Sequence, residues 1–295
     1  MIRLRRGPDH LGTLSIGDLP LELHGTDPFL IETIERRYGP FLTDDLGDVR
    51  IAIGLLDETR KGGGRDGAPA YAPTTEYRDR RLTMRSEVLE ATVDFATGEG
   101  SIEVIRCASA SEYYLENALR QIVQILAIER DAVLLHSAAV APPEGDRVFL
   151  FAGRSGAGKS TISEILRDAG GQVLSDDLVL LETRAASPQI VSTPFYGTLP
   201  PRNPKPVAIP LTTAFLLEQA SEASASDPLA LPAAVAALLT NVPFTGPLDA
   251  ETHCKMMDVI SRATRVVPVR TLRFRRDRSM LPLLGWQDAR KEVVR

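Results

Sequence analysis

The sequence predicts an α/β protein of two parts, a mixed-sheet α/β domain preceded by a smaller α+β N-terminal domain. Residues 1–107 contain short apolar stretches separated by turns, whereas residues 132–295 alternate strand and helix patterns with short connections. A long stretch with one apolar helical face lies between them, at residues 108–131. We therefore predict two domains joined by a connecting helix.

The N-terminal domain is expected to contain short strands and one helix. The predicted strands are Leu14–Leu23, Val49–Leu55, Arg81–Arg85, Ala91–Phe95 and Ser101–Arg106, the last two joined by a hairpin loop at Ala96–Gly100. The predicted helix covers Pro28–Tyr38. Glycines and prolines with little apolar content make Arg60–Pro73 a predicted mobile surface loop.

The connecting helix is expected to begin near Ser109, because Ser109 and Glu112 have capping-box spacing. Its apolar face is marked by Leu115, Leu119, Ile122 and Leu126. The predicted strands of the C-terminal domain are Val133–Ala141, Arg147–Ala152, Gln172–Ser175, Leu178–Glu182, Thr213–Leu217 and Val267–Phe274. Its predicted helices are Lys159–Asp168 and Pro232–Leu239, with a Ser/Ala loop at Ala220–Asp227.

Composition narrows the function classes. The net charge of -5 and the pI of about 5.5 give no electrostatic footprint for nucleic acid or an anionic membrane. The two cysteines, Cys107 and Cys254, are far apart and form no metal-binding motif. The basic start is followed by Gly7-Pro8 rather than by a signal-peptide core, and no stretch is long enough to span a bilayer. We expect a cytoplasmic protein.

The strongest chemical signal is a glycine-rich loop between a predicted strand and a predicted helix. Its residues are Gly153, Arg154, Ser155, Gly156, Ala157, Gly158, Lys159 and Ser160, followed by Thr161, and they match the Walker A pattern at every fixed position. Such glycines let backbone N–H groups point at phosphate oxygens, and a helix N-terminus adds the positive end of its dipole. Lys159 is expected to reach the β- and γ-phosphates, and Ser160 to bind Mg²⁺.

Two adjacent carboxylates, Asp176 and Asp177, follow the predicted strand Gln172–Ser175. A carboxylate at such a strand end lies beside the phosphates in P-loop folds, where one can hold the Mg²⁺ shell and another can accept a proton from an attacking hydroxyl. Adjacent strand residues point to opposite faces, so both carboxylates reach the site only if the strand ends or bends there. A solvated Asp-Asp turn is the alternative.

His136 lies within the apolar strand before the P-loop strand. A lone histidine in such a strand is usually a hydrogen-bonded core residue, and lining the site is the alternative.

Together these features resemble the catalytic domain of HPr kinase/phosphorylase and its relatives, whose nucleotide fold is akin to phosphoenolpyruvate carboxykinase. In that family a histidine-bearing strand turns through a short hairpin, here Pro142–Asp146, into the P-loop strand, and an Asp-Asp pair follows the P-loop helix. The resemblance covers about residues 130–285 and is specific between 133 and 182. It implies ATP and Mg²⁺ at Lys159 and Ser160, and a place for His136 near the acceptor or the phosphates.

The resemblance also implies that Asp176 and Asp177 supply a metal contact and the catalytic base. We assign Asp177, with Ser160, to the metal and Asp176 to the base. Two departures from the family matter. Thr161 stands where an acidic residue is usual, and the glycine-rich Glu-Ile-Arg-Gly-Leu-Gly segment linked to phosphorolysis is absent after Asp177. Phosphorolysis is therefore expected to be absent, and HPr is not assumed to be the acceptor.

A turn-rich segment, Thr198–Pro206, follows the site strands, and its Arg202 and Lys205 are cations suited to a phosphate or carboxylate. It is predicted either to close over the substrate or to be a solvated connector.

The leading hypothesis is an ATP-dependent kinase acting on a hydroxyl, a serine of a protein or peptide. A kinase of a small hydroxylated metabolite and a nucleotide-binding sensor with little catalysis are the alternatives. A GTPase would need an Asn-Lys-x-Asp motif, and a transporter-type ATPase a Leu-Ser-Gly-Gly motif; neither occurs. The acceptor, a preference for ATP or GTP, and assembly into a homo-oligomer stay open.

Overall fold

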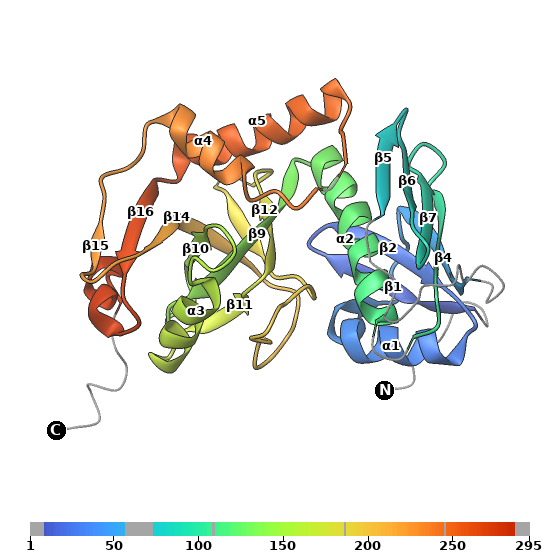
Figure 1. The fold of residues 1–295 in the computed structure, drawn as a ribbon, viewed down its shortest axis with the longest axis horizontal. Helices are drawn as coiled ribbons and strands as arrows, with labels where there is room; N and C mark the ends of the chain where they lie inside the picture. Colours follow the sequence, from blue (N-terminus) through green and yellow to red (C-terminus); the bar gives the residue numbers. More distant parts are fainter. Residues whose placement is uncertain (1–8, 57–72, 108–109, 186, 245, 287–295) are drawn as a thin grey trace. The chain divides into compact units, whose positions relative to one another are not determined.

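The computed structural model describes residues 9–56, 73–107, 110–185, 187–244 and 246–286 (Figure 1). The chain divides into two compact units. Unit 1 comprises residues 1–126 and 244–253, and unit 2 comprises residues 127–243 and 254–295. Most of the expected loop Arg60–Pro73 and the expected cap Ser109 lie outside the described residues.

The strands of unit 1 are β1 (His10–Ile16), β2 (Leu19–His24), β3 (Leu42–Thr43), β4 (Val49–Leu55), β5 (Thr74–Arg78), β6 (Arg81–Arg85), β7 (Leu89–Asp94) and β8 (Glu99–Val104). They form one mixed sheet in the order β3-β1-β2-β4-β8-β7-β6-β5. β4 is parallel to β2 and to β8, and the other neighbours are antiparallel. The predicted single strand Leu14–Leu23 is wrong. It is a hairpin, because Gly17 turns the chain at a φ of 59°.

Helix α1 (Pro28–Tyr38) makes the crossover that the parallel pair β2 and β4 requires. The Asp27 carboxylate caps it by accepting hydrogen bonds from the N–H groups of Phe29 and Leu30. Its buried face includes Ile34 and Tyr38. A short 3₁₀ turn, η1 (Gly39–Phe41), follows. Helix α2 (Ser111–Glu129) belongs to unit 1 as far as Leu126.

The strands of unit 2 are β9 (Ala132–Ala141), β10 (Val148–Ala152), β11 (Gln172–Ser175), β12 (Leu178–Glu182), β13 (Gln189–Val191), β14 (Ala208–Gln219), β15 (Ser224–Ala225) and β16 (Val269–Phe274). Its helices are α3 (Lys159–Asp168), α4 (Leu231–Leu239), most of α5 (Ala250–Val266) and the 3₁₀ segment η3 (Arg278–Leu284). The sheet order is β10-β9-β12-β13-β14-β16-β15, with β11 beside β9 and β10 also beside β14. The protein is therefore α/β with two mixed sheets.

An aromatic cluster fixes β10, the strand that leads into the glycine-rich loop, in the core of unit 2. Phe151 on β10 stacks on Phe215 of β14 at a ring separation of 5.7 Å, and Phe149 contacts Phe215 and Trp286. Helix α3 packs Ile162 and Leu166 against the same cluster. Both ends of the glycine-rich loop are thereby held by buried apolar contacts.

Several strand ends meet at one edge of this sheet. β10, β14 and β16 are parallel, so Ala152, Gln219 and Phe274 end at the same edge. β9 runs antiparallel to β10, with Ser137 opposite Ala152, which brings His136 to that edge. β11 is also antiparallel to β9 and ends there as well. Crevices at the carboxyl ends of such strands are where α/β folds bind ligands.

Most predicted elements are confirmed, including α1, α3, β4, β6, β11 and β12 at their predicted bounds. Others were missed, chiefly α5, β5 and β13, and β14 is longer than predicted. No helix among the described residues is long and apolar enough to cross a membrane.

The sheet of unit 1 predicts a sharp contrast between two glycine substitutions. A Cβ at Gly100 would lie 2.8 Å from the Thr92 carbonyl oxygen and 2.9 Å from Ile51, whereas a Cβ at Gly39 meets nothing within 4 Å. We expect Gly100→Ala to lower the free energy of unfolding by about 1 to 3 kcal/mol and Gly39→Ala to change it little. Urea denaturation of the two variants measures this. Equal stabilities would contradict the packing around β8.

Candidate functional site

The glycine-rich loop connects β10 to α3 and adopts a conformation that needs its glycines. Gly156 and Gly158 have φ angles of 80° and 107°. A Cβ at Gly158, the N-cap of α3, would also lie 2.6 Å from the Phe274 ring. The loop leads into the helix N-terminus, where backbone N–H groups and the helix dipole favour an anion.

The Lys159 side chain folds back along this loop. Its Nζ donates a hydrogen bond to the carbonyl oxygen of Gly153 at 2.9 Å, and the residue is only 8% exposed. Burial lowers the pKa of Lys159, and the charges of Asp177 and Asp176 oppose that effect. The site therefore holds a partly desolvated cation, which an anionic ligand would stabilise.

Asp176 and Asp177 lie in the break between two strands. β11 ends at Ser175, which is opposite Ala139 on β9, and β12 begins at Leu178, which is opposite His136. The sequence analysis required the strand to end or bend before both carboxylates could reach one site. β11 does end just before them. Both aspartates line the same pocket.

The Asp176 carboxylate is buried and accepts several hydrogen bonds. Its Oδ1 accepts from the N–H of Gly197 at 2.8 Å, and its Oδ2 accepts from the N–H of Leu199 at 2.9 Å. The hydroxyls of Thr198 and Ser160 each lie 3.4 Å from Oδ2. Because both of its oxygens already accept hydrogen bonds, this carboxylate is poorly placed to accept a proton from a substrate. It is better suited to holding Ser160 and residues 197–199 in position.

Asp177 has a different environment. Its Oδ1 lies 3.3 Å from Nε2 of His136, and the side chains are 21% and 47% exposed respectively. His136 is thus a residue of the site rather than of the core. Such a carboxylate–imidazole pair, open to the pocket, can share or transfer a proton.

A pocket of about 410 Å³ brings these groups together. It is lined by His136, Gly156, Gly158, Lys159, Ser160, Thr161, Asp176, Asp177, Gly197, Thr198 and Gln219. A second pocket of about 910 Å³ shares His136, Gly156 and Gln219 with it and includes Gly153, Arg154, Ser155 and Ala157 of the loop. All the predicted loop, carboxylate and histidine residues therefore line two adjoining pockets.

Arg202 and Lys205 are not brought into this site. They line a separate pocket of about 260 Å³ beside Arg167 and Gln172. The segment to which they belong does reach the site, but through Thr198 and Leu199, which bond to Asp176. The substrate role predicted for the two cations gains no support from their position.

Asn241 was missed by sequence reasoning. Its Oδ1 accepts a hydrogen bond from the N–H of Gly153 at 3.1 Å, and its own carbonyl oxygen accepts one from the N–H of His136 at 2.6 Å. Asn241 follows α4, far from the loop in sequence, so no local pattern signals this role. It ties the start of the loop to the strand that carries the histidine.

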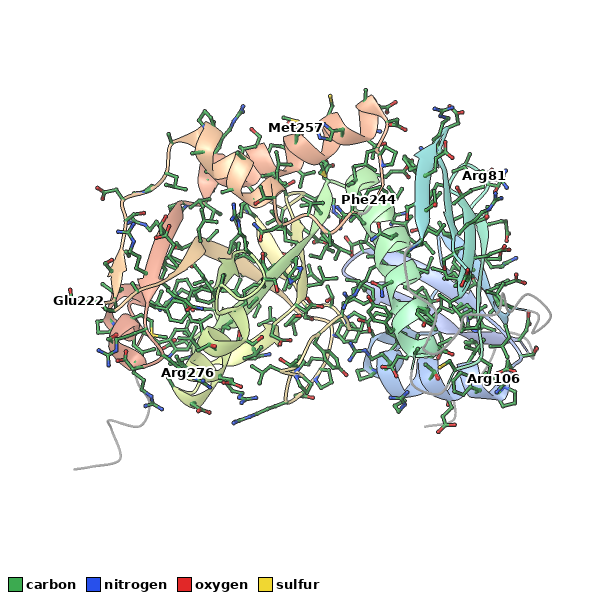
Figure 2. The ribbon with its side chains drawn as sticks, viewed as in Figure 1. Arg81, Arg106, Glu222, Phe244, Met257 and Arg276 are labelled. Atoms are coloured by element: carbon green, nitrogen blue, oxygen red, sulfur yellow. The ribbon has the colours of Figure 1, made fainter. Side chains whose placement is uncertain are left out.

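Gln219 was missed as well, although it ends a strand that was predicted in part. Its Nε2 donates a hydrogen bond to the carbonyl oxygen of Gly156 at 2.8 Å. It also lines a pocket of about 380 Å³ that contains Thr161, Phe274, Arg275 and Arg276, the last labelled in Figure 2. The two arginines follow β16 and line this pocket next to the loop, although Arg275 also lies 2.5 Å from Oδ2 of Asp277 and Arg276 lies 3.9 Å from Glu164.

No family model matches the chain, and a search of curated proteins found no match. The resemblance to HPr kinase accordingly stays a prediction.

The buried ammonium of Lys159 leads to a stability prediction. Burial lowers the pKa of Lys159 in the folded chain. At any pH below that folded pKa, the charged lysine therefore reduces the free energy of unfolding. This loss of stability disappears as the pH rises from the folded pKa to the pKa of the unfolded chain. We expect Lys159→Met, without any ligand, to raise the free energy of unfolding at neutral pH by about 1 kcal/mol. Lys205→Met, at an exposed position, is the control and should leave stability unchanged.

Chemical denaturation of both variants at neutral pH measures the difference. A clear loss of stability confined to Lys159→Met would instead show that the ammonium stabilises the free loop.

Proposed function

We propose that this chain is a magnesium-dependent kinase that transfers the γ-phosphate of ATP to a hydroxyl group, that of a serine in a protein or peptide. One observation carries the proposal. The P-loop lysine, the Ser160 hydroxyl, two carboxylates and a histidine all line one pocket at the end of the P-loop strand. Asp177 and His136 next to the loop favour catalysis over the alternative of a nucleotide sensor, for which the loop alone would be enough.

The residues present fit ATP with magnesium. The loop N–H groups and Lys159, whose buried ammonium lies against the loop, would hold the β- and γ-phosphates. Ser160 and Asp176 would hold the magnesium, which when bound neutralises charge on the phosphates. Arg275 and Arg276, beyond Thr161, are suited to the remaining part of the nucleotide.

The surroundings of the two aspartates favour roles opposite to those assigned from the sequence. Asp176 is engaged by backbone N–H groups and lies next to Ser160, which suits a metal site. Asp177 faces the pocket beside His136, which suits the general base. We therefore propose Asp177 as base and Asp176 as the residue that helps Ser160 hold magnesium.

In this mechanism the acceptor oxygen attacks the γ-phosphorus while its proton passes to Asp177. The bond between the γ-phosphorus and the bridging oxygen breaks, and ADP leaves. His136, 3.3 Å from Asp177, orients that carboxylate and can take over the proton. Lys159 remains in place to stabilise the charge on the transferred phosphoryl group.

The larger pocket supports one alternative acceptor. Its volume of about 910 Å³ lies in the range of small-molecule sites, and it adjoins the phosphate pocket at His136. A hydroxylated metabolite could therefore occupy it, in place of a serine side chain, with the same catalytic residues.

Phosphoryl transfer from labelled ATP tests the function. The protein is incubated with Mg²⁺, γ-labelled ATP and cell extract separated into macromolecular and small-molecule fractions. We expect label to appear in a polypeptide, and in a small molecule if the alternative holds. Label confined to ATP and inorganic phosphate in both fractions would contradict the kinase proposal.

The carboxylate roles predict different defects for two isosteric variants. Asp177→Asn should lower turnover by about 10² to 10⁴ and leave the affinity for Mg²⁺–ATP nearly unchanged, because a base acts in the transition state. Asp176→Asn should weaken Mg²⁺–ATP binding as well, because it removes the charge beside Ser160. Calorimetry for affinity and labelled transfer for turnover separate the two.

Lys159→Ala serves as the control for binding and should lose affinity for nucleotide. The reverse pattern in the two aspartate variants would restore the assignment made from the sequence. Full turnover in both would contradict the mechanism.

A further inference from the structure

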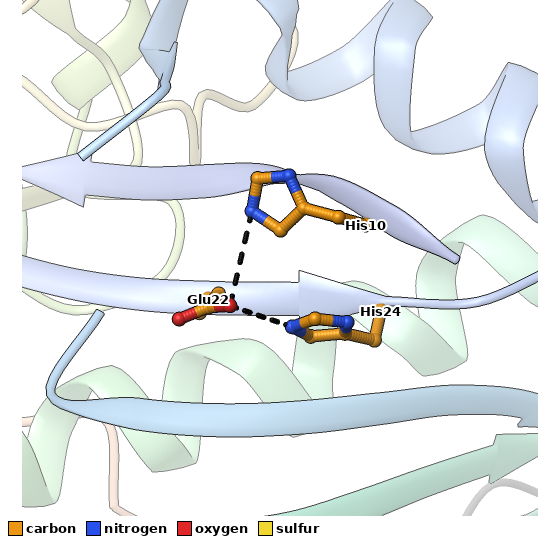
Figure 3. A group of neighbouring side chains, drawn as sticks. All are labelled: His10, Glu22 and His24. Atoms are coloured by element: carbon orange, nitrogen blue, oxygen red, sulfur yellow. Dashed lines mark hydrogen bonds and ion pairs between the residues drawn. The ribbon is translucent and has the colours of Figure 1, made fainter. Parts of the chain in front are cut away.

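Three potential metal ligands meet at one end of the β1–β2 hairpin in unit 1. His10 begins β1 and is the register partner of His24, which ends β2. Glu22 precedes His24 by two residues on the same strand, so the two side chains share a face of the sheet. Figure 3 shows both imidazole rings turned toward the Glu22 carboxylate.

The ligand atoms are close together and largely shielded from solvent. Oε1 of Glu22 lies 2.8 Å from Nε2 of His24 and 4.0 Å from Nε2 of His10, and one ligand atom from each residue lies within 4.8 Å of the others. His10 and Glu22 are 2% and 5% exposed. Ligand atoms about 2.0 to 2.2 Å from a tetrahedral zinc ion are roughly 3.3 Å apart, a value between the two separations seen here.

Neighbouring groups orient two of the three ligands. The other oxygen of Glu22, Oε2, accepts a hydrogen bond from the N–H of Gly47 at 3.4 Å, which leaves Oε1 facing the histidines. The other nitrogen of His24, Nδ1, lies 3.4 Å from Oδ2 of Asp9. A metal-binding histidine characteristically donates its second N–H to a carboxylate in this way, which keeps the ligand nitrogen unprotonated.

We propose that His10, Glu22 and His24 bind a divalent transition-metal ion of the zinc class. Two imidazoles and one carboxylate suit zinc and its neighbours rather than magnesium or calcium, which prefer oxygen ligands. Three protein ligands leave a fourth position for water. The site ties β1 to β2 at the open end of their hairpin and is independent of the proposed kinase activity.

One cation competes for the same carboxylate. Nε of Arg50 lies 3.8 Å from Oε1 of Glu22, but its side chain is 55% exposed and its Nη1 also lies 3.7 Å from Glu99. When a metal ion binds Oε1 of Glu22, Arg50 can therefore move away from Glu22 and keep its contact with Glu99. In the competing interpretation, Glu22 forms an ion pair with a protonated His24 and no metal binds. The experiment must distinguish this ion pair from a metal site.

Titration with Co²⁺ and Zn²⁺ tests the proposal. The chelator-treated full-length protein is titrated with Co²⁺ and its visible spectrum recorded. We expect one ion per chain with the intense bands of a tetrahedral site and no thiolate charge-transfer band, and displacement of the bands by Zn²⁺. His24→Gln should abolish them, and Zn²⁺ should raise the thermal midpoint of the wild type but not of this variant.

His253→Gln is the matched control, because His253 is an exposed histidine on α5 outside the cluster. It should bind Co²⁺ as the wild type does. His10→Gln gives a second variant, and circular dichroism checks that each variant folds. Absence of tetrahedral bands, or the same bands in His24→Gln, would overturn the proposal.

Discussion

The candidate site depends on the buried carboxylate of Asp176. Its two oxygens accept hydrogen bonds from the backbone N–H groups of Gly197 and Leu199 and lie next to the hydroxyls of Ser160 and Thr198. It therefore links the end of β11, the start of α3 and the segment that returns after β13. A buried carboxylate without these donors would be costly, so the three segments are required to meet there.

The sheet supplies the other constraint. β9 carries His136 and pairs with β10, β11 and β12. The glycine-rich loop and the aspartate pair follow strands that neighbour β9, so they come close to His136. Asn241 then ties His136 to Gly153 through two hydrogen bonds. The chemistry of the site thus rests on backbone pairing and on a few buried polar side chains, with Asp177 left accessible beside His136. This difference between the two carboxylates is why we assign proton transfer to Asp177.

Local signals in the sequence predicted much of this arrangement. The Walker A glycines, the apolar run of β10 and the helix pattern of α3 all lie within a short stretch of chain, so these patterns together predict where the loop lies. The partners of Asp176 and of Gly153 could not be predicted, because they come from distant segments with no pattern of their own. The hairpin at Gly17 was missed because apolar residues continue on both sides of it. Helix α5 was also missed, although its sequence does carry an apolar helical face, formed by Met256, Val259, Ile260 and Ala263.

A crystal structure with Mg²⁺ and a non-hydrolysable ATP analogue would test the proposed kinase site most directly. We expect the triphosphate in the glycine-rich loop, magnesium beside Ser160 and Asp176, and the γ-phosphate next to Lys159 with Asp177 and His136 facing it. A triphosphate bound elsewhere, or a γ-phosphate directed away from Asp177, would contradict it.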